Sequence, residues 1–371
     1  MKEKLGDIFE IGSGGTPPKS HPEYYGGNIP WIKTGDLKSE YLYMAEDYIT
    51  EEGLNNSSAK IYEKGTVLLA MYGATIGATS ILKIEACTNQ ACAAFKKNDR
   101  VIPEYLYYFL KSQKEKFVKD GVGGAQPNIS AGYLKKVEME IPPFEVQRSI
   151  VNTLDKTVSI ANKRNKELNA LDDLIKARFV EMFGDPKLNN KEWNSGIVSE
   201  YYEVKGGKRI PKGRGYSDKI TQHPYLRATD MKNETIIDDD IHYIDDEVYE
   251  HIKRYTVKGG DIYLTNVGVN LGMAGVIPEK YDGANLTENA VKLVPKKENV
   301  LASVFMAHYI NSPGIQDYIN ERKMSVGVPK LAIFRIETMP ILLPPLELQN
   351  QFVNFVCQVD KLKYVAIQAA V

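Results

Sequence analysis

The stretch IPPFEVQ at residues 141–147 returns about 200 residues later as LPPLELQ at residues 343–349. Each copy ends a region of short, β-like apolar runs and begins a long pattern of helical period. A repeat at so large a spacing indicates two similar modules in one chain. Two similar modules suggest two similar tasks.

The repeat extends upstream without a break in order. The further matched segments are PWIKTGDL (30–37) with PYLRATDM (224–231), glycines 65, 73 and 77 with glycines 260, 268 and 272, TNQA (88–91) with TENA (287–290), and YLYYFL (105–110) with FMAHYI (305–310). Low identity within a kept order is expected when two modules share a fold while their surfaces read different things.

Length and composition limit the class of protein. The 371 residues suggest two or three domains, each with its own core. No run of about 18 apolar residues is present and the N-terminus lacks a signal-peptide core, so we expect a cytoplasmic protein with no membrane partner. Cys87, Cys92 and Cys357 lack the spacing of a zinc site and are expected to be buried structural thiols.

The net charge of −1 conceals a local segregation of charge. Basic residues gather in the glycine-rich stretch 205–214, and acidic residues gather at 238–247. Nucleic-acid-binding proteins often have a basic balance, but a basic reading face and an acidic back would sum to nearly zero. DNA binding therefore remains open.

Long helices are predicted after both Pro-Pro pairs. The first runs from residue 145 to about residue 183, and its apolar residues recur at the heptad spacing of a coiled-coil seam. Its seam residues are Leu154, Ala161, Leu168, Ile175 and Met182, with Ile150 and Leu171 between them. Those of the second helix are Phe352, Phe355, Val359, Leu362, Ala366 and Ala369. We expect the two helices to pack as an antiparallel coiled coil.

The predicted fold class is α+β, with two similar globular modules separated by these long helices. The predicted segments are a first module at 1–144, a central helix and linker at 145–192, a second module at 193–345, and a distal helix at 346–371. Inside the first module, one helix is expected at about residues 103–119.

Patterns that suggest catalysis do not hold. GSGGTPPKS at residues 12–20 lacks the third glycine of a dinucleotide fingerprint and the glycine before lysine of a Walker loop. The Pro-Pro segments resemble the Asp/Asn-Pro-Pro-Tyr/Phe motif of amino-methyltransferases, but Ile141 and Leu343 supply no acceptor for a target amine. The histidines show no metal or triad spacing, and the acidic run is expected to be a solvated edge. We expect no catalytic residue and no metal on this chain.

Polar, basic and aromatic residues on glycine-rich loops remain as candidates for DNA binding. Arg or Lys can donate to guanine, and Asn or Gln can pair with adenine. The candidates in the first module are Tyr72, Thr75, Asn89, Gln126 and Asn128. Those in the second module are Lys208, Arg209, Lys212, Arg214, Arg227, Asn266, Asn270, Asn289 and Lys330. A turn-forming or surface role is the alternative for each.

These features together resemble the specificity subunit of Type I restriction-modification enzymes over essentially the whole chain. The matching segments are GGTP (14–17), IPWI (29–32), GDL (35–37), GKRIPKG (207–213), YLR (225–227), DM (230–231), KARFVEMFGDP (176–186) and both Pro-Pro-x-Glu-x-Gln segments. The distal helix is shorter than its usual counterpart in similar proteins, which suggests either a truncated C-terminus or a remainder supplied by another molecule.

The resemblance implies two target recognition domains, each reading one half of a split, asymmetric site in double-stranded DNA. It also implies helices that set the spacing and dock methylation subunits, which bind S-adenosylmethionine and methylate adenine. A restriction subunit, which uses ATP and Mg, can then join. This chain itself is expected to bind no cofactor.

Two alternatives remain open on sequence. One is a fused or relict DNA adenine methyltransferase whose recognition region this chain resembles. The other is a protein-interaction scaffold that has lost DNA binding.

Overall fold

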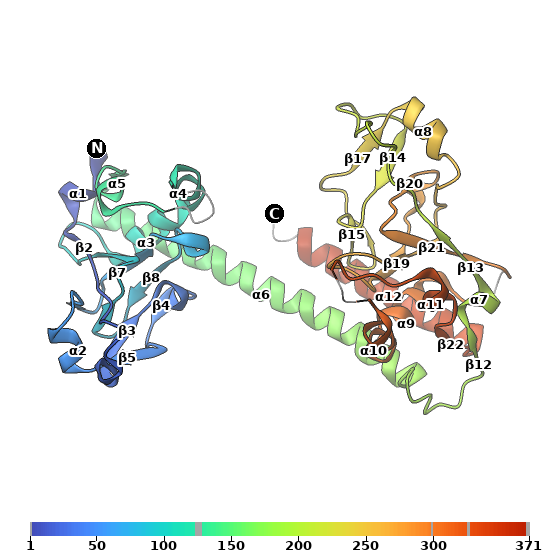
Figure 1. Ribbon diagram of the computed structural model, residues 1–371, viewed down its shortest axis with the longest axis horizontal. Coiled ribbons are helices and arrows are strands. Elements are labelled where there is room, and N and C mark those ends of the chain that lie inside the picture. Colours follow the sequence, from blue (N-terminus) through green and yellow to red (C-terminus); the bar gives the residue numbers. More distant parts are fainter. Residues whose placement is uncertain (1, 123–127, 298–299, 325–326, 369–371) are drawn as a thin grey trace. The chain divides into compact units, whose positions relative to one another are not determined.

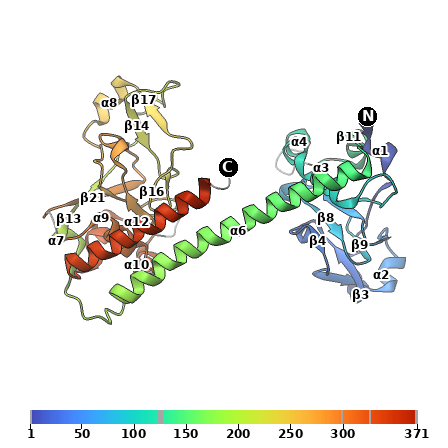
Figure 2. The same cartoon turned by 180° about the vertical axis from the view of Figure 1, so that it is seen from behind.

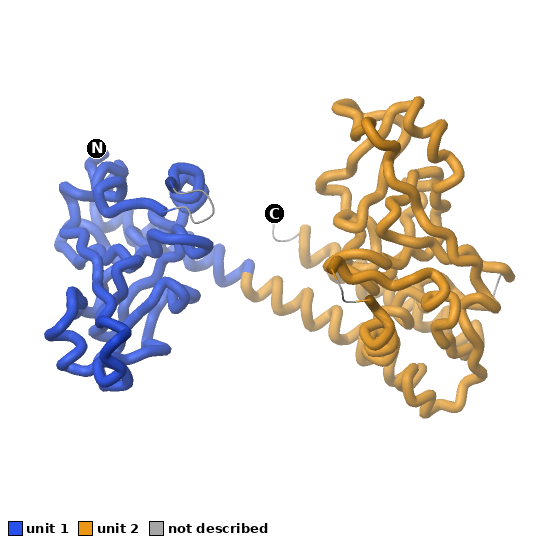
Figure 3. Tube along the Cα trace, viewed as in Figure 1, with its two compact units in different colours: residues 1–161 blue, residues 162–371 orange. Residues whose placement is uncertain are grey.

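The computed structural model describes residues 2–122, 128–297, 300–324 and 327–368. The chain divides into two compact units, Met1–Ala161 and Asn162–Val371 (Figure 3). Each unit combines helices with sheets, so the predicted mixed helix and sheet fold is confirmed. Helix α6 (Phe144–Phe183) is continuous across the division (Figure 1), within one residue of its predicted start.

Two main sheets form the first unit. The five-stranded sheet has the order β2 (Ile11–Ser13), β10 (Cys92–Phe95), β7 (Val67–Ala70), β8 (Thr79–Leu82), β4 (Tyr41–Leu42). The four-stranded sheet has the order β5 (Asp47–Ile49), β3 (Tyr25–Ile32), β9 (Ala86–Thr88), β6 (Ile61–Tyr62), and β1 (Lys2–Lys4) pairs with β11 (Glu138–Glu140). All residues of β7, β8 and β10 are buried, which explains their uninterrupted apolar or small composition.

Short helices complete the first unit. They are α1 (Leu5–Ile8), α2 (Glu51–Asn55), α3 (Pro103–Ser112), α4 (Lys114–Asp120) and α5 (Ala131–Leu134), with 3-10 turns η1 (Pro22–Tyr24), η2 (Thr34–Asp36) and η3 (Gly73–Thr75). The single helix predicted at 103–119 is therefore two helices. The chain tightens at Gln113, whose N–H donates to Leu110 and Lys111, and this local change is not visible in the apolar spacing.

The second unit repeats this plan. Its main sheet has the order β13 (Tyr202–Gly206), β21 (Ala290–Pro295), β18 (Ile262–Thr265), β19 (Ala274–Val276). A three-stranded sheet has the order β17 (His242–Ile244), β14 (His223–Leu226), β20 (Asn285–Leu286). Two strand pairs complete the sheets, β15 (Met231–Lys232) with β16 (Thr235–Ile236) and β12 (Ser195–Ile197) with β22 (Pro340–Leu342). Its helices are α7 (Val198–Tyr201), α8 (Asp246–Ile252), α9 (Ser303–Asn311), α10 (Pro313–Arg322), α11 (Ile333–Glu337) and α12 (Leu346–Gln368), with the 3-10 turn η4 (Glu279–Tyr281).

The parallel strand pair is repeated between the units. In the first unit Trp31 of β3 lies opposite Cys87 of β9, and in the second Tyr225 of β14 lies opposite Asn285 of β20. Because parallel strands end at the same edge of a sheet, the loops that follow them are brought together in both units. The duplicated fold thus positions duplicated loops.

The antiparallel pairing corrects the sequence alignment by one residue. In the first unit Cys92 lies opposite Ala70, and in the second Ala290 lies opposite Thr265. Strand register therefore equates Cys92 with Ala290, whereas the sequence alignment equated Ala91 with Ala290. The preceding loop residues must be matched with the same shift.

A buried glutamine joins each module to its long helix. Gln147 donates to the carbonyls of Arg100 (2.8 Å) and Pro142 (2.9 Å) and accepts from the N–H of Ile102 (3.0 Å). Gln349 makes the same set with Val300 O (3.1 Å), Pro344 O (2.9 Å) and Ala302 N (2.9 Å). The last residue of the repeated seven-residue stretch is thus a structural bridge in both copies.

In the second unit, the end of α6 packs antiparallel to α12 (Figure 2). The rings of Phe179 and Phe183 lie 5.5 and 5.6 Å from the ring of Phe352. Farther along, Lys363 Nζ lies 2.6 Å from a carboxylate oxygen of Asp172. Residue numbers rise in one helix as they fall in the other, which fixes the direction.

The apolar seam differs in part from the heptad prediction. Ile175 and Val359 are buried as predicted, but Leu362 is 57% exposed, and Val356, which was not predicted, is buried. Ala161 is exposed, and Ala369 lies outside the described residues. Val356 is buried because α12 packs on a globular core as well as on α6. Leu362 is exposed because the neighbouring Lys363 faces α6 instead and pairs with Asp172.

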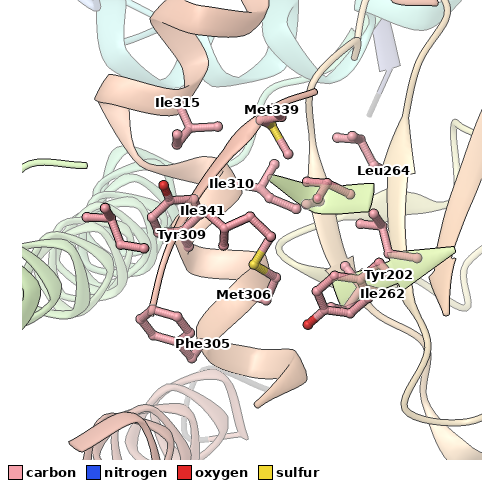
Figure 4. Close-up of a cluster of buried hydrophobic side chains, with 14 of the residues drawn as sticks. Tyr202, Ile262, Leu264, Phe305, Met306, Tyr309, Ile310, Ile315, Met339 and Ile341 are labelled. Atoms are coloured by element: carbon pink, nitrogen blue, oxygen red, sulfur yellow. The ribbon is translucent and has the colours of Figure 1, made fainter. Parts of the chain in front are cut away.

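The core of the second unit connects these helices with the main sheet (Figure 4). Figure 4 shows Ile262 and Leu264 of β18 facing Met306 and Ile310 of α9. Phe305 of the same helix stacks with Phe179, at 5.8 Å between ring centroids. Helix α9 is buried on most sides, which accounts for its nearly continuous apolar sequence.

The cysteines divide into two environments. Burial raises the pKa of Cys87 to about 11 and that of Cys92 to about 12, as expected for inert structural thiols. Cys357 is exposed on α12, so its predicted burial is wrong. Among the described residues, no group of three or more His, Cys, Asp or Glu could hold a metal ion. None of the helices in that part of the chain is long and apolar enough to span a membrane.

Candidate nucleic-acid interface

Loops of the second unit surround a surface cavity of about 360 Å³. It is lined by Arg209 and Ile210 after β13, Tyr216, Tyr225, Arg227 to Thr229 after β14, and Thr287 to Asn289 after β20. Three residues predicted to contact DNA, Arg209, Arg227 and Asn289, are therefore brought together. The parallel pairing of β14 and β20 is the structural cause.

Arg209 and Glu288 connect two loops across this cavity. Arg209 Nε donates to Glu288 Oε1 at 2.5 Å, and the two side chains are 78% and 29% exposed. Burial alone would raise the pKa of Glu288, but hydrogen bonds with Arg209 and local donors lower it below its usual value. Both groups therefore carry their charges at neutral pH, with the guanidinium facing solvent.

Tyr225 and Lys208 fix the loop that carries Arg209. The Tyr225 hydroxyl donates to the carbonyl of Lys208 at 2.8 Å, and the N–H of Lys208 donates to Leu286 O at 2.8 Å. Burial raises the pKa of Tyr225 to about 12, so the hydroxyl stays protonated and remains a donor. The Lys208 side chain is exposed, with its ammonium 5.7 Å from the centre of the Tyr255 ring.

Arg227 is held by carboxylates rather than presented freely. Its Nη2 donates to Asp230 Oδ1 (2.7 Å) and Asp240 Oδ2 (3.0 Å), and its side chain is 20% exposed. The hydrogen bond with Asp230 is the main cause that raises the pKa of Arg227. A DNA contact by Arg227 would have to compete with these bonds.

A second group of predicted residues adjoins the cavity. The N–H of Asn266 donates to Asn289 O at 3.0 Å, and the chain at Lys330 bridges to Val267. Asn266 is only 5% exposed, and its Oδ1 has no hydrogen-bond partner among the described residues. Asn270 donates weakly to Ala228 O at 3.5 Å. Asn266 therefore supports the loop, while Lys330 is exposed beside it.

The remaining basic residues lie on the loop after β13. Lys212 and Arg214 are both exposed, and Arg214 forms an ion pair with Glu247. The acidic stretch thus neutralises part of the basic stretch within the same unit. Lys212 has no ion pair among the described residues.

The first unit contains a matching loop arrangement. Trp31 Nε1 donates to Gly15 O at 3.0 Å. This bond is equivalent to the one from the Tyr225 hydroxyl to Lys208 O in the second unit. Thr16 Oγ1, one residue later, donates to Gln90 Oε1 at 2.5 Å. This contact between two loops is structurally equivalent to the contact between Arg209 and Glu288 in the second unit.

Two residues predicted in the first unit, Tyr72 and Thr75, lie on the loop between β7 and β8, and Asn89 follows β9. The chain at Tyr72 bridges to Asn128, and Thr75 Oγ1 donates to the carbonyl of Tyr72 at 3.0 Å. Asn89 Oδ1 accepts from the N–H of Ala91 at 3.2 Å. Tyr72 and Asn128 are exposed, whereas Gln126 lies outside the described residues.

Sequence reasoning missed Thr16, Gln90 and Glu288. The repeat contained the necessary signal, but the alignment matched Gln90 with Asn289. The one-residue shift given by strand register matches Gln90 with Glu288 instead. Asn289 and Glu288 both line the cavity, so the error concerns which residue occupies the equivalent position.

The duplicated frame and its two polar loop clusters define a two-module recognition protein. Residues 1–170 and 190–369 match the family model described as the Type I restriction modification DNA specificity domain. The chain belongs to this family. It is a specificity subunit, and its function is sequence-specific recognition of DNA within a Type I restriction-modification system.

Relatives agree with this assignment, and solved structures agree with the fold. The MjaIX specificity subunit of Methanocaldococcus jannaschii is 28% identical over 95% of this chain and 85% of its own length. A crystal structure of a Type I system S subunit from M. genitalium matches with a TM-score of 0.56 at 15% identity, covering 100% of this chain and 91% of that one. A structure described under complex assembly and conformational transition of the type I R-M system gives a TM-score of 0.59 at 15% identity, covering 100% and 93%. The two structural matches support the fold.

Proposed function

We propose that each module, at residues 1–144 and 193–345, is a target recognition domain that reads one half of a bipartite, asymmetric site in double-stranded DNA. The main support is the duplicated loop arrangement, in which a contact between two loops recurs at Thr16 with Gln90 and at Arg209 with Glu288. The same frame with different side chains is what two different half-sites require. The predicted contact residues supply the surrounding polar and basic surface.

The long helices then act as spacer and docking surface. Central segment 145–192 and distal segment 346–371 form an antiparallel coiled coil in this proposal, supported by the contacts between α6 and α12. Exposed apolar side chains on both helices favour a protein partner: Ile160 is 54% exposed, Tyr364 64% and Val365 62%. The partners are methylation subunits and, through the complex, a restriction subunit.

This chain has no catalytic step of its own in the proposed complex. S-adenosylmethionine belongs to the methylation subunit, and ATP with Mg belongs to the restriction subunit. The failed phosphate-loop and methyltransferase patterns support this division. The methyltransferase alternative is not favoured by the family match.

Binding and methylation assays test the proposal. The purified chain should bind no S-adenosylmethionine, and addition of a methylation subunit should create sequence-specific adenine methylation. Saturable cofactor binding by the chain alone would restore the methyltransferase alternative. Absence of salt-dependent binding to duplex pools, with no specific methylation by the complex, would contradict DNA recognition and favour the scaffold.

A further inference from the structure

The cross-loop pairs, Thr16 with Gln90 and Arg209 with Glu288, occupy one structural position in two copies. The N–H of Gly15 donates to Thr88 O at 2.9 Å, and that of Lys208 donates to Leu286 O at 2.8 Å. Thr16 and Arg209 come one residue after Gly15 and Lys208, respectively. Gln90 and Glu288 come two residues after Thr88 and Leu286. The backbone next to both members of each pair therefore makes the same hydrogen bond in the two modules.

A second set of bonds fixes the same loops. The N–H of Asn89 donates to Ile32 O at 2.9 Å, and that of Thr287 donates to Leu226 O at 3.0 Å. Gln90 directly follows Asn89, and Glu288 directly follows Thr287. The equivalence therefore rests on backbone geometry on both sides of the pair and is independent of the side chains.

The second unit presents guanine-reading chemistry at this position. Glu288 engages Nε of Arg209, and neither Nη of Arg209 has a hydrogen bond among the described residues. A guanidinium held at Nε keeps its two Nη groups as a fork, which matches guanine O6 and N7. Glu288 Oε2 accepts from Thr287 Oγ1 at 3.2 Å, and the lone pairs left on the carboxylate suit the N4 amino group of the paired cytosine.

The first unit presents adenine-reading chemistry at the same position. Thr16 donates to one lone pair of Gln90 Oε1 and so orients the amide. The second lone pair of Oε1 can accept from adenine N6, while Nε2 donates to N7. Gln90 is exposed, as a reading group must be. The methyl group of Thr16 suits contact with the methyl group of thymine.

We propose that the cross-loop pair is a base-reading position in each module, where Arg209 with Glu288 reads a G·C pair and Gln90 with Thr16 reads an A·T pair. This inference rests on the proposed function, since it names bases within the half-sites. A phosphate contact by Arg209 is the competing role. It would use the charge of Arg209 and make no use of the fork.

Variants of the pair separate these roles in the full chain assembled with its methylation subunit. Selection from a randomised duplex pool first defines the wild-type site. Arg209→Lys keeps the charge and removes the fork, so it should lose roughly tenfold to a hundredfold discrimination at one G·C position. The double variant Thr16→Arg with Gln90→Glu should convert one A·T position of the other half-site to G·C. Gln90→Glu alone should lose the adenine preference there, because a carboxylate cannot donate to N7.

Lys212→Ala is the matched control on the same basic loop. It should weaken binding to all sequences alike and leave the selected site unchanged. Thermal melting shows that each variant is folded, and the single Gln90→Glu variant serves if the double variant is not. Unchanged discrimination in Arg209→Lys, or a kept A·T position in the Gln90 variants, would overturn the inference while leaving the proposed function intact. A wild-type complex that selects no sequence would overturn the proposed function itself.

Discussion

At the scale of single residues, the buried glutamines illustrate how one side chain secures a junction. Gln349→Ala would leave Ala302 N–H and the carbonyls of Val300 and Pro344 without their partner. An unsatisfied buried polar group costs about 1–3 kcal/mol, so we expect a loss of about 2 kcal/mol or more in the free energy of unfolding. Chemical denaturation of the full chain measures it. Exposed Asn350→Ala on the same helix is the control and should be nearly neutral.

Glu234 gives a pH-dependent prediction. Burial alone would raise its pKa, but hydrogen bonds from His308 and Asn311 and the charge of Lys363 lower it below the usual value near 4.5. A carboxyl with a lowered folded-state pKa stabilises the protein above its unfolded pKa, and this contribution is lost as pH falls through the folded value. Glu234→Gln should therefore reduce stability at pH 7 and flatten the acid side of the stability curve. An unchanged slope below pH 4.5 would show that this carboxyl is not linked to folding.

Features of single side chains could be read along the chain, whereas contacts between distant residues could not. Arg209 was selected as a candidate because a basic residue in a glycine-rich loop can be recognised from the sequence alone. Glu288 and Gln90 were missed because their partners lie 79 and 74 residues away along the chain. Asn266 was predicted to contact DNA, and only the fold reveals that it is buried.

At the scale of elements, the contact between α6 and α12 should be a major source of stability in the second unit. Phe352 is fully buried against Phe179 and Phe183. Phe352→Ala should lower the free energy of unfolding by about 3–5 kcal/mol, because it creates a cavity where the two helices meet the core. Val180→Ala, at an exposed position of α6, should change it little. A small effect of Phe352→Ala, no larger than that of Val180→Ala, in denaturant titrations would mean that the helix contact contributes little to stability.

The first and last residues of the long helices could be predicted from the sequence, whereas the residues on their buried faces were harder to predict. The Pro-Pro pair before Phe144 and the glycine after Phe183 mark α6 to within a residue. The heptad rule placed Ile175 correctly and missed Val356, because a helix that also covers a globular core buries a wider stripe than a coiled-coil seam. The break at Gln113 left the apolar period unchanged and so gave no signal.

At the scale of the whole molecule, the spacer role predicts a change in site length. Four residues inserted near Asn165, with a register-matched insertion in α12, add about 6 Å of helix at 1.5 Å per residue. DNA rises about 3.4 Å per base pair, so the unread spacer should lengthen by one or two pairs while both half-sites keep their sequences. Circular dichroism and co-purification with the methylation subunit verify folding and assembly.

A replacement control keeps helix length constant. Alanine at the exposed positions Asn162, Lys163, Asn165 and Lys166 changes the surface of α6 without adding residues. This variant should methylate at the original spacing. An assembled insertion variant that also keeps the original spacing would rule out the helix pair as the determinant of spacer length.

The duplication of the fold was readable from the sequence because the order of conserved turns and helix starts survived. The residue-by-residue alignment of the two copies could not be read from the sequence. A shift of one residue before Ala290 fits the apolar pattern equally well. Hydrogen-bond register removes that ambiguity, because Cys92 and Ala290 face equivalent partners. The bases recognised lie beyond the sequence, since they depend on contact geometry and DNA shape.

Exchange of one module tests the two-module account most directly. Residues 1–144 would be replaced by the corresponding module of a relative, and methylated adenines would be mapped in cells that contain the chain with its methylation subunit. We predict that one half-site changes while the other half-site and the spacer stay the same. A change in both half-sites, or an unchanged site in a folded and assembled exchange variant, would contradict independent reading by two modules.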